Sequence, residues 1–245
     1  MERNIHALAG RLEKWKYQIS DEQVDQLLRF YDMLIETNRQ MNLTSITEFD
    51  EVMVKHFVDS AAPALLPNPK MPFLPTSGVR VLDLGTGAGF PGIPLKILFP
   101  ELELTLVDSL NKRIKFILQS VEQLGLKNIT AVHARAEELA RKPEYREQFD
   151  ICLSRAVANL PVLTEYCMPF VKPGGKFISY KGGDAGEELR CAARAIQLTG
   201  GKLSGSYEYE LPDSDYRRTL IVIDKCKPTS KKYPRKAGTP AKDPL

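Results

Sequence analysis

The sequence lacks any run of apolar residues that approaches the roughly 20 needed to cross a membrane. Its N-terminus, MERNIHALAGRLEKW, carries acidic residues and no apolar run, which is not typical of a secretion signal. Cysteine is scarce and scattered, at Cys152, Cys167, Cys191 and Cys226, without the C-x-x-C pairs of zinc and redox sites. We therefore expect a cytoplasmic protein with no membrane anchor and no metal site, whose thiols are reduced and buried.

The composition is that of a soluble globular protein, with 43 % hydrophobic and 27 % charged residues among 245. A chain of this length can form one large α/β domain or two small ones. Its charge is uneven: residues 225–245 hold seven Lys or Arg and one Asp, a net charge of +6, while the whole chain carries +3. Such a basic end indicates either a polyanionic partner or a solvated, disordered tail, and charge alone does not separate the two.

The first 62 residues are predicted to form a helical cap. Ser20 and Gln23 have the spacing of a capping box, and apolar residues then recur on one helical face as far as Ile35. Another helix is expected to begin near Thr47. Five prolines then make residues 63–78 a stiff linker or surface loop.

From Val79 onward, strand and helix signals alternate, which predicts a parallel sheet with helices on both faces. A turn is expected at KPGG, residues 172–175, before the fifth strand. Two β-rich runs follow, with only PDSDYR between them, so they should pair antiparallel. The predicted organisation is a cap over 1–62, a linker over 63–78, an α/β domain with a seven-stranded sheet over 79–226 and a basic tail over 227–245.

The stretch DLGTGAGFPGIP, residues 83–94, fits two nucleotide-binding templates at once. Gly85, Gly87 and Gly89 form G-x-G-x-G, and the last two with Gly92 form G-x-G-x-x-G, the dinucleotide fingerprint. Asp108 follows about 20 residues later and could accept hydrogen bonds from ribose hydroxyls in NAD or in S-adenosylmethionine. The glycines and this carboxylate therefore leave both cofactors open, as well as a tight turn without a ligand.

The residues around the glycines favour S-adenosylmethionine. Pro91 and Pro94 remove two N–H groups from the helix start, and Phe90 places an apolar group where two phosphates would need donors. Asp83 completes the D-x-G-x-G-x-G form typical of methyltransferases. An antiparallel hairpin at the end of the sheet is also the methyltransferase arrangement. We therefore predict a Rossmann-like class I S-adenosylmethionine-dependent methyltransferase.

The chain resembles the bacterial small-subunit ribosomal RNA guanine-N7 methyltransferases, also called the glucose-inhibited division protein B family. The resemblance covers nearly the whole chain and rests on the order and spacing of NLTSI, KHFVDS, DLGTGAGFPGIPLKI, VDSLNKRIKF, RAEE, SRAVANL, KPGGKFISYKG and KKYPRKAGTP. It implies methyl transfer from S-adenosylmethionine to N7 of a guanine in a loop of 16S ribosomal RNA. The substrate would be free RNA or the ribosomal subunit, with no obligate protein partner apparent.

The resemblance also implies which residues bind the cofactor. They are Gly85, Thr86, Gly87, Phe90, Asp108, Ala136, Glu137 and Arg155. Within this set, Asp108 would hold the ribose hydroxyls, and Ala136 and Glu137 would lie beside the adenine. These positions agree with the predicted fold, because ligands of open α/β sheets bind at the carboxyl ends of the strands.

Methylation of guanine N7 needs no general base, because that atom carries an in-plane lone pair and no proton. The enzyme must chiefly orient the two reactants. The sequence agrees: it has SRAVANLP where enzymes acting on exocyclic amines usually carry an [N/D]-P-P-[Y/F] element, and no Pro-Cys nucleophile. Arg155 and Lys181 are the candidates to contact O6, with a surface salt bridge as the alternative for each.

Other polar residues are expected to contact RNA or to support the cap. The candidates for RNA contact are Arg135, Lys181, Lys231, Lys232, Arg235 and Lys236. Arg135 could instead pair with Glu137, and His56 is expected to orient the cap helix rather than to catalyse. The target should be an unstacked loop guanine, since A-form RNA hides its bases, and Phe90 is one candidate to stack on it. A non-catalytic RNA-binding assembly factor and an oxidoreductase remain alternative functions.

Overall fold

The computed structural model describes residues 6–66 and 78–245, without the side chain of His6. Its centre is a seven-stranded sheet in the order β3-β2-β1-β4-β5-β7-β6. The strands are β1 (Arg80–Leu84), β2 (Glu103–Asp108), β3 (Ile129–His133), β4 (Phe149–Arg155), β5 (Val171–Gly182), β6 (Gly201–Glu210) and β7 (Arg217–Lys225). Strands β1 to β5 are parallel, and β7 pairs antiparallel with β5 and β6, which confirms the predicted terminal hairpin.

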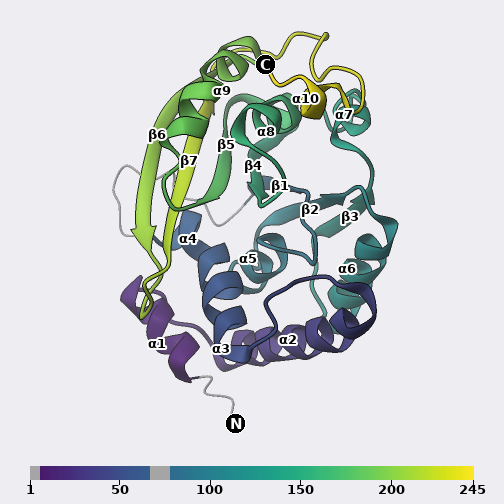
Figure 1. The fold of residues 1–245 in the computed structure, drawn as a ribbon. Helices are drawn as coiled ribbons and strands as arrows, with labels where there is room; N and C mark the ends of the chain where they lie inside the picture. Colours follow the sequence, from purple (N-terminus) through teal and green to yellow (C-terminus); the bar gives the residue numbers. More distant parts are fainter. Residues whose placement is uncertain (1–5, 67–77) are drawn as a thin grey trace.

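Helices cover both faces of the sheet (Figure 1). The α/β part holds α5 (Gly92–Leu98), α6 (Asn111–Gln123), α7 (Ala136–Leu139), α8 (Leu160–Cys167), the short 3₁₀ helix η2 (Met168–Phe170), α9 (Gly186–Leu198) and α10 (Thr239–Lys242). Side chains of successive residues in a strand point to opposite faces of the sheet, so they pack into the two hydrophobic clusters on its two faces. Leu153 of β4 packs into one cluster with α5 and α6, and its neighbour Cys152 packs into the other, with α8 and α9.

The N-terminal residues form the expected helical cap at the base of the molecule in Figure 1. It consists of α1 (His6–Lys14), α2 (Asp21–Met41), α3 (Phe49–Val52), a π-helix η1 (Met53–Val58) and α4 (Asp59–Leu65). The capping box of Ser20 and Gln23 is confirmed at the start of α2. The Gln23 amide also donates to the carbonyls of Ile97 and Leu98 at 3.0 Å, which ties the cap to the end of α5.

Three boundaries differ from the sequence prediction. The helix expected from near Thr47 begins at Phe49, and α4 continues through Pro63 to Leu65, into the range predicted as a linker. Residues 67–77 of that linker lie outside the described residues. The residues predicted as a KPGG turn lie inside β5. Glycine is needed at position 175, because a Cβ there would lie only 2.4 Å from the backbone oxygen of Asp150.

One expectation about the surface is wrong. All four cysteines are free, but only Cys152 and Cys167 are buried, whereas Cys191 and Cys226 are exposed. For the basic tail, the alternative of a disordered segment does not hold, because Tyr233 and Pro240 are buried against the rest of the chain, although most tail residues are exposed. None of the helices in residues 6–66 and 78–245 combines the length and apolar character of a membrane span.

Gly92 offers a test of how tightly the glycine motif is packed on the sheet. A Cβ at this position would lie 2.2 Å from Leu106 Cδ2 and 2.9 Å from Asp83 Oδ2. We expect Gly92→Ala to lower the free energy of unfolding, measured by urea denaturation, by about 1–3 kcal/mol, as overpacking does. Gly87→Ala is the control, since its Cβ would meet no atom within 4 Å and only its φ of +61° would be strained. Equal losses in both variants would contradict the packing argument.

Candidate functional site

A first cleft opens where β1, β2, β3 and β4 end. Its volume is about 150 Å³, and its lining includes Gly85, Asp108, Ala136, Glu137 and Tyr166. The structure therefore brings together four of the residues that the resemblance assigns to the cofactor, contributed by segments far apart in the chain. Their place at the carboxyl ends of parallel strands is where open α/β sheets bind ligands.

The glycine loop and Asp108 hold each other in place at this cleft. Gly85, Gly87 and Gly89 have φ of +72°, +61° and +96°, which glycine adopts without strain. The N–H of Gly87 donates to Asp108 Oδ2 at 3.0 Å, and that of Leu110 donates to Asp108 Oδ1 at 2.9 Å. Arg113 Nη1 also donates to Asp108 Oδ2, at 3.3 Å. The buried carboxylate is thereby fixed at the cleft and keeps about one of its four lone-pair sites for a further donor such as a ribose hydroxyl.

Asp83, the first residue of the motif, lies fully buried behind the loop. Its Oδ2 accepts from the Thr86 hydroxyl at 2.6 Å and from the N–H of Gly92 at 2.9 Å, whereas Oδ1 has no partner among the described residues. Burial raises the pKa of this carboxyl to about 6, against the lowering effect of its two hydrogen bonds. Asp83 therefore braces the loop from behind, and Thr86 serves the loop by holding Asp83.

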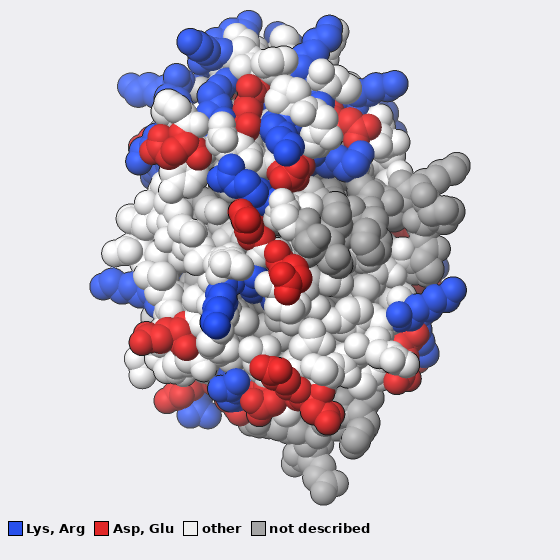
Figure 2. Space-filling view, turned by 180° about the vertical axis from the view of Figure 1, so that it is seen from behind, with Lys and Arg blue, Asp and Glu red and all other residues white. Residues whose placement is uncertain are grey.

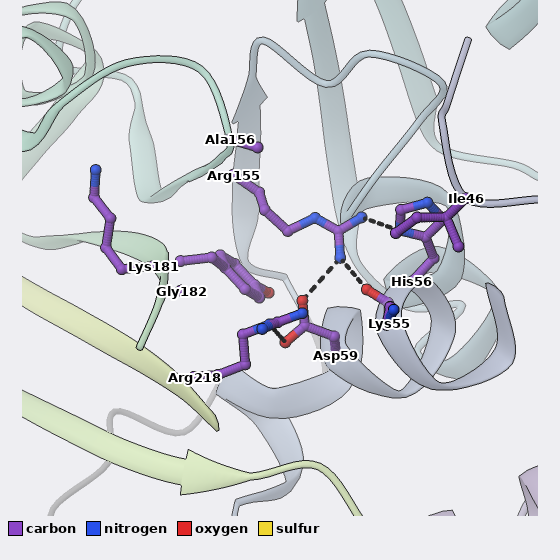
Figure 3. A pocket seen from close by; sticks show the side chains of 10 residues that line it. Ile46, Lys55, His56, Asp59, Arg155, Ala156, Lys181, Gly182 and Arg218 are labelled. Atoms are coloured by element: carbon purple, nitrogen blue, oxygen red, sulfur yellow. Dashed lines mark hydrogen bonds and ion pairs between the residues drawn. The ribbon is translucent and has the colours of Figure 1, made fainter. Parts of the chain in front are cut away.

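A second pocket of about 370 Å³ lies between the cap and the sheet (Figure 3). Its lining combines cap residues with residues at the ends of β4, β5 and β7, and includes Lys55, His56, Asp59, Arg155, Tyr180 and Arg218. The cap therefore supplies one wall of a cavity that the α/β part could not form alone.

Arg155 is the centre of this pocket. Its Nη1 donates to Asp59 Oδ2 at 3.0 Å and to the carbonyl of Lys55 at 3.1 Å, and its Nη2 donates to His56 Nδ1 at 3.2 Å. Asp59 is buried and also accepts from the Tyr209 hydroxyl at 2.7 Å. The ion pair of Arg155 is therefore internal, not a surface salt bridge. Three of its five N–H groups are used within the described residues, which leaves two for a ligand.

His56 is held neutral beside Arg155. Its Nδ1 accepts from Arg155, so Nε2 carries the proton toward the Thr44 hydroxyl, 3.0 Å away. Burial, and then the charge of Arg155, lowers the pKa of His56 to about 3. The backbone N–H of Thr44 donates to Asn38 Oδ1 at 2.8 Å, which fixes the turn between the cap helices. His56 thus positions Arg155 and stays in its neutral form at neutral pH.

Phe90 lies under His56 instead of in either cavity. The two rings stack with centroids 4.4 Å apart, and Phe30 and Phe57 cover the same phenyl ring at 5.5 and 6.1 Å. Only 6 % of Phe90 is exposed. This placement does not suit the expected contacts with the cofactor or with a flipped guanine, because the aromatic cluster of the cap covers the ring.

The buried state of His56 predicts a pH dependence of stability. The unfolded state binds a proton below about pH 6.5, but the folded state does so only near pH 3, so stability from His56 falls as the pH falls through this range. The raised pKa of Asp83 makes its contribution to stability change with pH in the opposite direction between pH 3.8 and about 6. We therefore compare the stabilities of two variants at each pH instead of the stability of one protein across pH. The stability advantage of wild type over His56→Gln should shrink between pH 6.5 and 4 by up to about 1.4 kcal/mol per pH unit. Urea unfolding measures it, with the exposed His133→Gln as control; a constant difference would contradict the assignment.

The remaining basic candidates do not share the contacts of Arg155. Lys181 also lines the second pocket. Its ammonium donates to the Ala158 carbonyl at 3.0 Å and pairs with Glu188 at 2.6 Å, pointing away from Arg155 in Figure 3. The salt bridge proposed as its alternative is therefore present. Arg135 borders the first cleft and makes no ion pair with Glu137 in the part of the chain that the structure describes. In the tail, Lys231, Lys232 and Lys236 are exposed, while Arg235 is bound to Glu165.

The two cavities are neighbours across the end of β4. Arg155 and Ala156 line the second pocket, and Val157 lines the first. A Cβ on Gly85 would lie only 2.3 Å from Val157 Cγ2, so the glycine loop and this segment are in close contact. The two cavities therefore lie at one edge of the sheet, beside successive residues at the end of β4.

Sequence reasoning missed three members of the site. Asp59 lies in the KHFVDS motif, but its pairing with Arg155 spans 96 positions in the chain, so no local pattern reveals it. Tyr209 and Arg218 come from the terminal hairpin, whose β pattern carries no signal for the pocket.

Comparisons with known proteins agree with this architecture. A family model described as GidB, rRNA small subunit methyltransferase G, matches residues 23–211. Curated relatives named Ribosomal RNA small subunit methyltransferase G include one from Acetivibrio thermocellus, 49 % identical over 93 % of this chain and 90 % of its own length. Another, from Lachnoclostridium phytofermentans, is 52 % identical over 93 % and 91 %. A solved structure described as "Conversion of a Disulfide Bond into a Thioacetal Group during Echinomycin Biosynthesis" covers 62 % of this chain and 77 % of its own at 16 % identity, with a TM-score of 0.50, and shows likeness of fold alone.

Proposed function

Because the chain belongs to the GidB family of rRNA small subunit methyltransferases, we propose that it methylates N7 of a loop guanine in 16S ribosomal RNA, with S-adenosylmethionine as donor. The family supports methylation of small-subunit rRNA. The observation that carries the proposal is that successive residues at the end of β4 line two cavities, one beside a glycine loop and one around Arg155.

The first cleft is the proposed donor site. S-adenosylmethionine would supply an electrophilic methyl group on a sulfonium, so the site need not bind phosphate. Asp108 would accept from the ribose hydroxyls, and Ala136 and Glu137 would lie beside the adenine. The loop supports this choice through Pro91 and Pro94, which have no N–H to offer to the phosphates of a dinucleotide.

The second cavity is the proposed acceptor site. The lone pair of guanine N7 forms the new N–C bond as the S–C bond breaks, and the base gains the positive charge that the sulfonium loses. No proton moves, which agrees with a neutral His56 and with an Asp59 already paired with Arg155. The free N–H groups of Arg155 would donate to O6, and its ion pair with Asp59 would keep the pocket from repelling a cationic base.

Substrate binding would use cations at the mouth of the acceptor pocket. Lys55 and Arg218 line it, and we propose that they contact backbone phosphates beside the target nucleotide. We place the activity in the bacterial cytoplasm, where ribosomal RNA is transcribed and assembled. An assembly factor without catalysis would bind the same RNA, so binding alone does not test the proposal.

A methyl-transfer assay separates these functions. Small ribosomal subunits and free 16S rRNA from a strain that lacks the gene would be incubated with the protein and methyl-labelled S-adenosylmethionine. We expect label in the rRNA, and strand cleavage at the labelled nucleotide after borohydride and aniline treatment, which acts at 7-methylguanosine. RNA binding without label would overturn the enzymatic function, and label that resists this cleavage would overturn the choice of N7. Binding of NADH in preference to S-adenosylmethionine would restore the oxidoreductase alternative.

A further inference from the structure

The C-terminal tail folds over helices α7 and α8, close to the first cleft (Figure 1). Its main anchor is Arg235, whose Nη2 contacts Glu165 Oε2 at 2.8 Å and whose Nε contacts Glu165 Oε1 at 3.0 Å. The backbone N–H of Arg235 donates to the same carboxylate at 2.7 Å. Glu165 is fully buried in α8, so this bidentate pair is an internal contact and not a meeting of surface charges.

A second anchor comes from the segment that follows α7. Arg146 donates to the carbonyls of Thr229 at 2.7 Å and Tyr233 at 3.1 Å, and Arg141 donates to that of Pro234 at 2.7 Å. These bonds use the main chain of the tail. The tail and the segment after α7 therefore stabilise each other over several residues.

The tail also touches a residue of the cleft itself. The N–H of Gly238 donates to Glu137 Oε1 at 2.9 Å, and Glu137 is only 5 % exposed. Tyr166 follows Glu165 on α8 and lines the same cleft, and burial followed by the charge of Glu137 raises its pKa to about 12. The two helices that carry the lining residues are thus joined by one segment that comes from the far end of the chain.

We propose that residues 228–243 are a positioning element of the cofactor site: by joining α7 to α8 and binding the Glu137 carboxylate, they set the affinity for the adenine end of S-adenosylmethionine. The inference rests on the proposed function. Helix α7 has only four residues, too few to hold a buried carboxylate in place without support. Without Gly238, Glu137 would lose a hydrogen bond inside the cleft.

This role divides the basic residues of the tail into two groups. Arg235 is committed to Glu165, and its charge is not available to a polyanion. Lys231, Lys232 and Lys236 remain exposed and free to contact RNA. Charge on this end of the molecule is mixed in sign: Figure 2 shows Lys and Arg over its top interspersed with Asp and Glu.

The test compares variants of the full chain by calorimetric titration with S-adenosylmethionine. We expect Arg235→Ala, and truncation after Tyr233, to raise the Kd for S-adenosylmethionine at least tenfold, and Arg235→Lys to give an intermediate value because it keeps the charge without the bidentate fork. The control Lys231→Ala/Lys236→Ala removes the same kind of charge without touching Glu165 and should stay within twofold of wild type. In turnover assays the KM for S-adenosylmethionine should rise while kcat at saturation stays close to wild type.

Each outcome bears on one claim. If wild type binds S-adenosylmethionine and the Arg235 variants bind it equally well, the positioning role is overturned. It is also overturned if they lose only affinity for rRNA, or if kcat falls with KM unchanged. If Arg235→Ala proves unfolded in a thermal scan, the folded Arg235→Lys protein decides. Failure of wild type to bind S-adenosylmethionine would overturn the proposed function itself.

Discussion

Replacing Arg155 with alanine is expected to lower kcat/KM for rRNA methylation by about 100- to 1000-fold, the usual effect of losing one preorganised donor. The guanidinium is held by Asp59, His56 and the Lys55 carbonyl, so its free N–H groups are fixed before the base arrives. Methyl transfer assays with rRNA at saturating S-adenosylmethionine measure the effect. Arg155→Lys keeps the charge but cannot make all three contacts, and should lose at least tenfold.

Loss of stability must be separated from loss of function in this experiment. Arg155→Ala leaves the Asp59 carboxylate buried without its closest cation, which costs about 3–5 kcal/mol for a pair of this kind. The double variant Asp59→Asn/Arg155→Met removes both charges and should unfold at a urea concentration close to that of wild type. Its activity should stay as low as that of Arg155→Ala. Recovery of activity in the double variant would mean that Arg155 serves the fold alone.

Asp108→Ala is expected to raise the Kd for S-adenosylmethionine by about 10- to 100-fold, in line with about 1.5–3 kcal/mol for hydrogen bonds to a charged group. The substitution removes the proposed ribose acceptor. It also removes the partner of the Gly87 N–H, which fixes the glycine loop. Calorimetry or equilibrium dialysis measures the affinity directly, without RNA.

A matched control for Asp108 lies on the far side of the sheet. Asp224 on β7 pairs with Lys176 at a partly exposed position, away from both cavities. Asp224→Ala should therefore leave the affinity for S-adenosylmethionine within twofold of wild type. If Asp108→Ala binds S-adenosylmethionine as tightly as this control does, Asp108 does not hold the cofactor.

Local patterns predicted most of the fold. The structure confirms the capping box at Ser20, the alternation of strands and helices and the terminal hairpin. Each of these features depends on a pattern within a few consecutive residues. The glycine loop and Asp108 were also predictable, since a motif and a strand end place both at one edge of the sheet. The resemblance then linked this architecture to methylation of ribosomal RNA.

Contacts between distant parts of the chain could not be predicted. Phe90 belongs to a motif that suggests a ligand contact, which stays a prediction, and its neighbours in the structure come from α2 and η1, which no local pattern places over it. Arg235 and Glu165 are 70 positions apart, so the charge of the tail alone did not reveal that the tail is folded. Helix and strand periodicity reports which face of an element is buried, but not which partner buries it.

The ring of Phe30 in α2 joins the cap to the catalytic part. It lies 5.5 Å from Phe90 in the glycine loop, 6.0 Å from Phe57 in η1 and 6.2 Å from Phe116 in α6, between ring centroids. One continuous hydrophobic cluster therefore extends from the cap to the sheet. Among the described residues of this cluster, no polar layer divides the cap from the sheet. The two parts should unfold as one cooperative unit, with slow amide exchange in α2 tracking that of β1. Under the proposed function, any opening of the cap would loosen the glycine loop beside the donor site, so substrate enclosure and donor retention would depend on the same folding equilibrium.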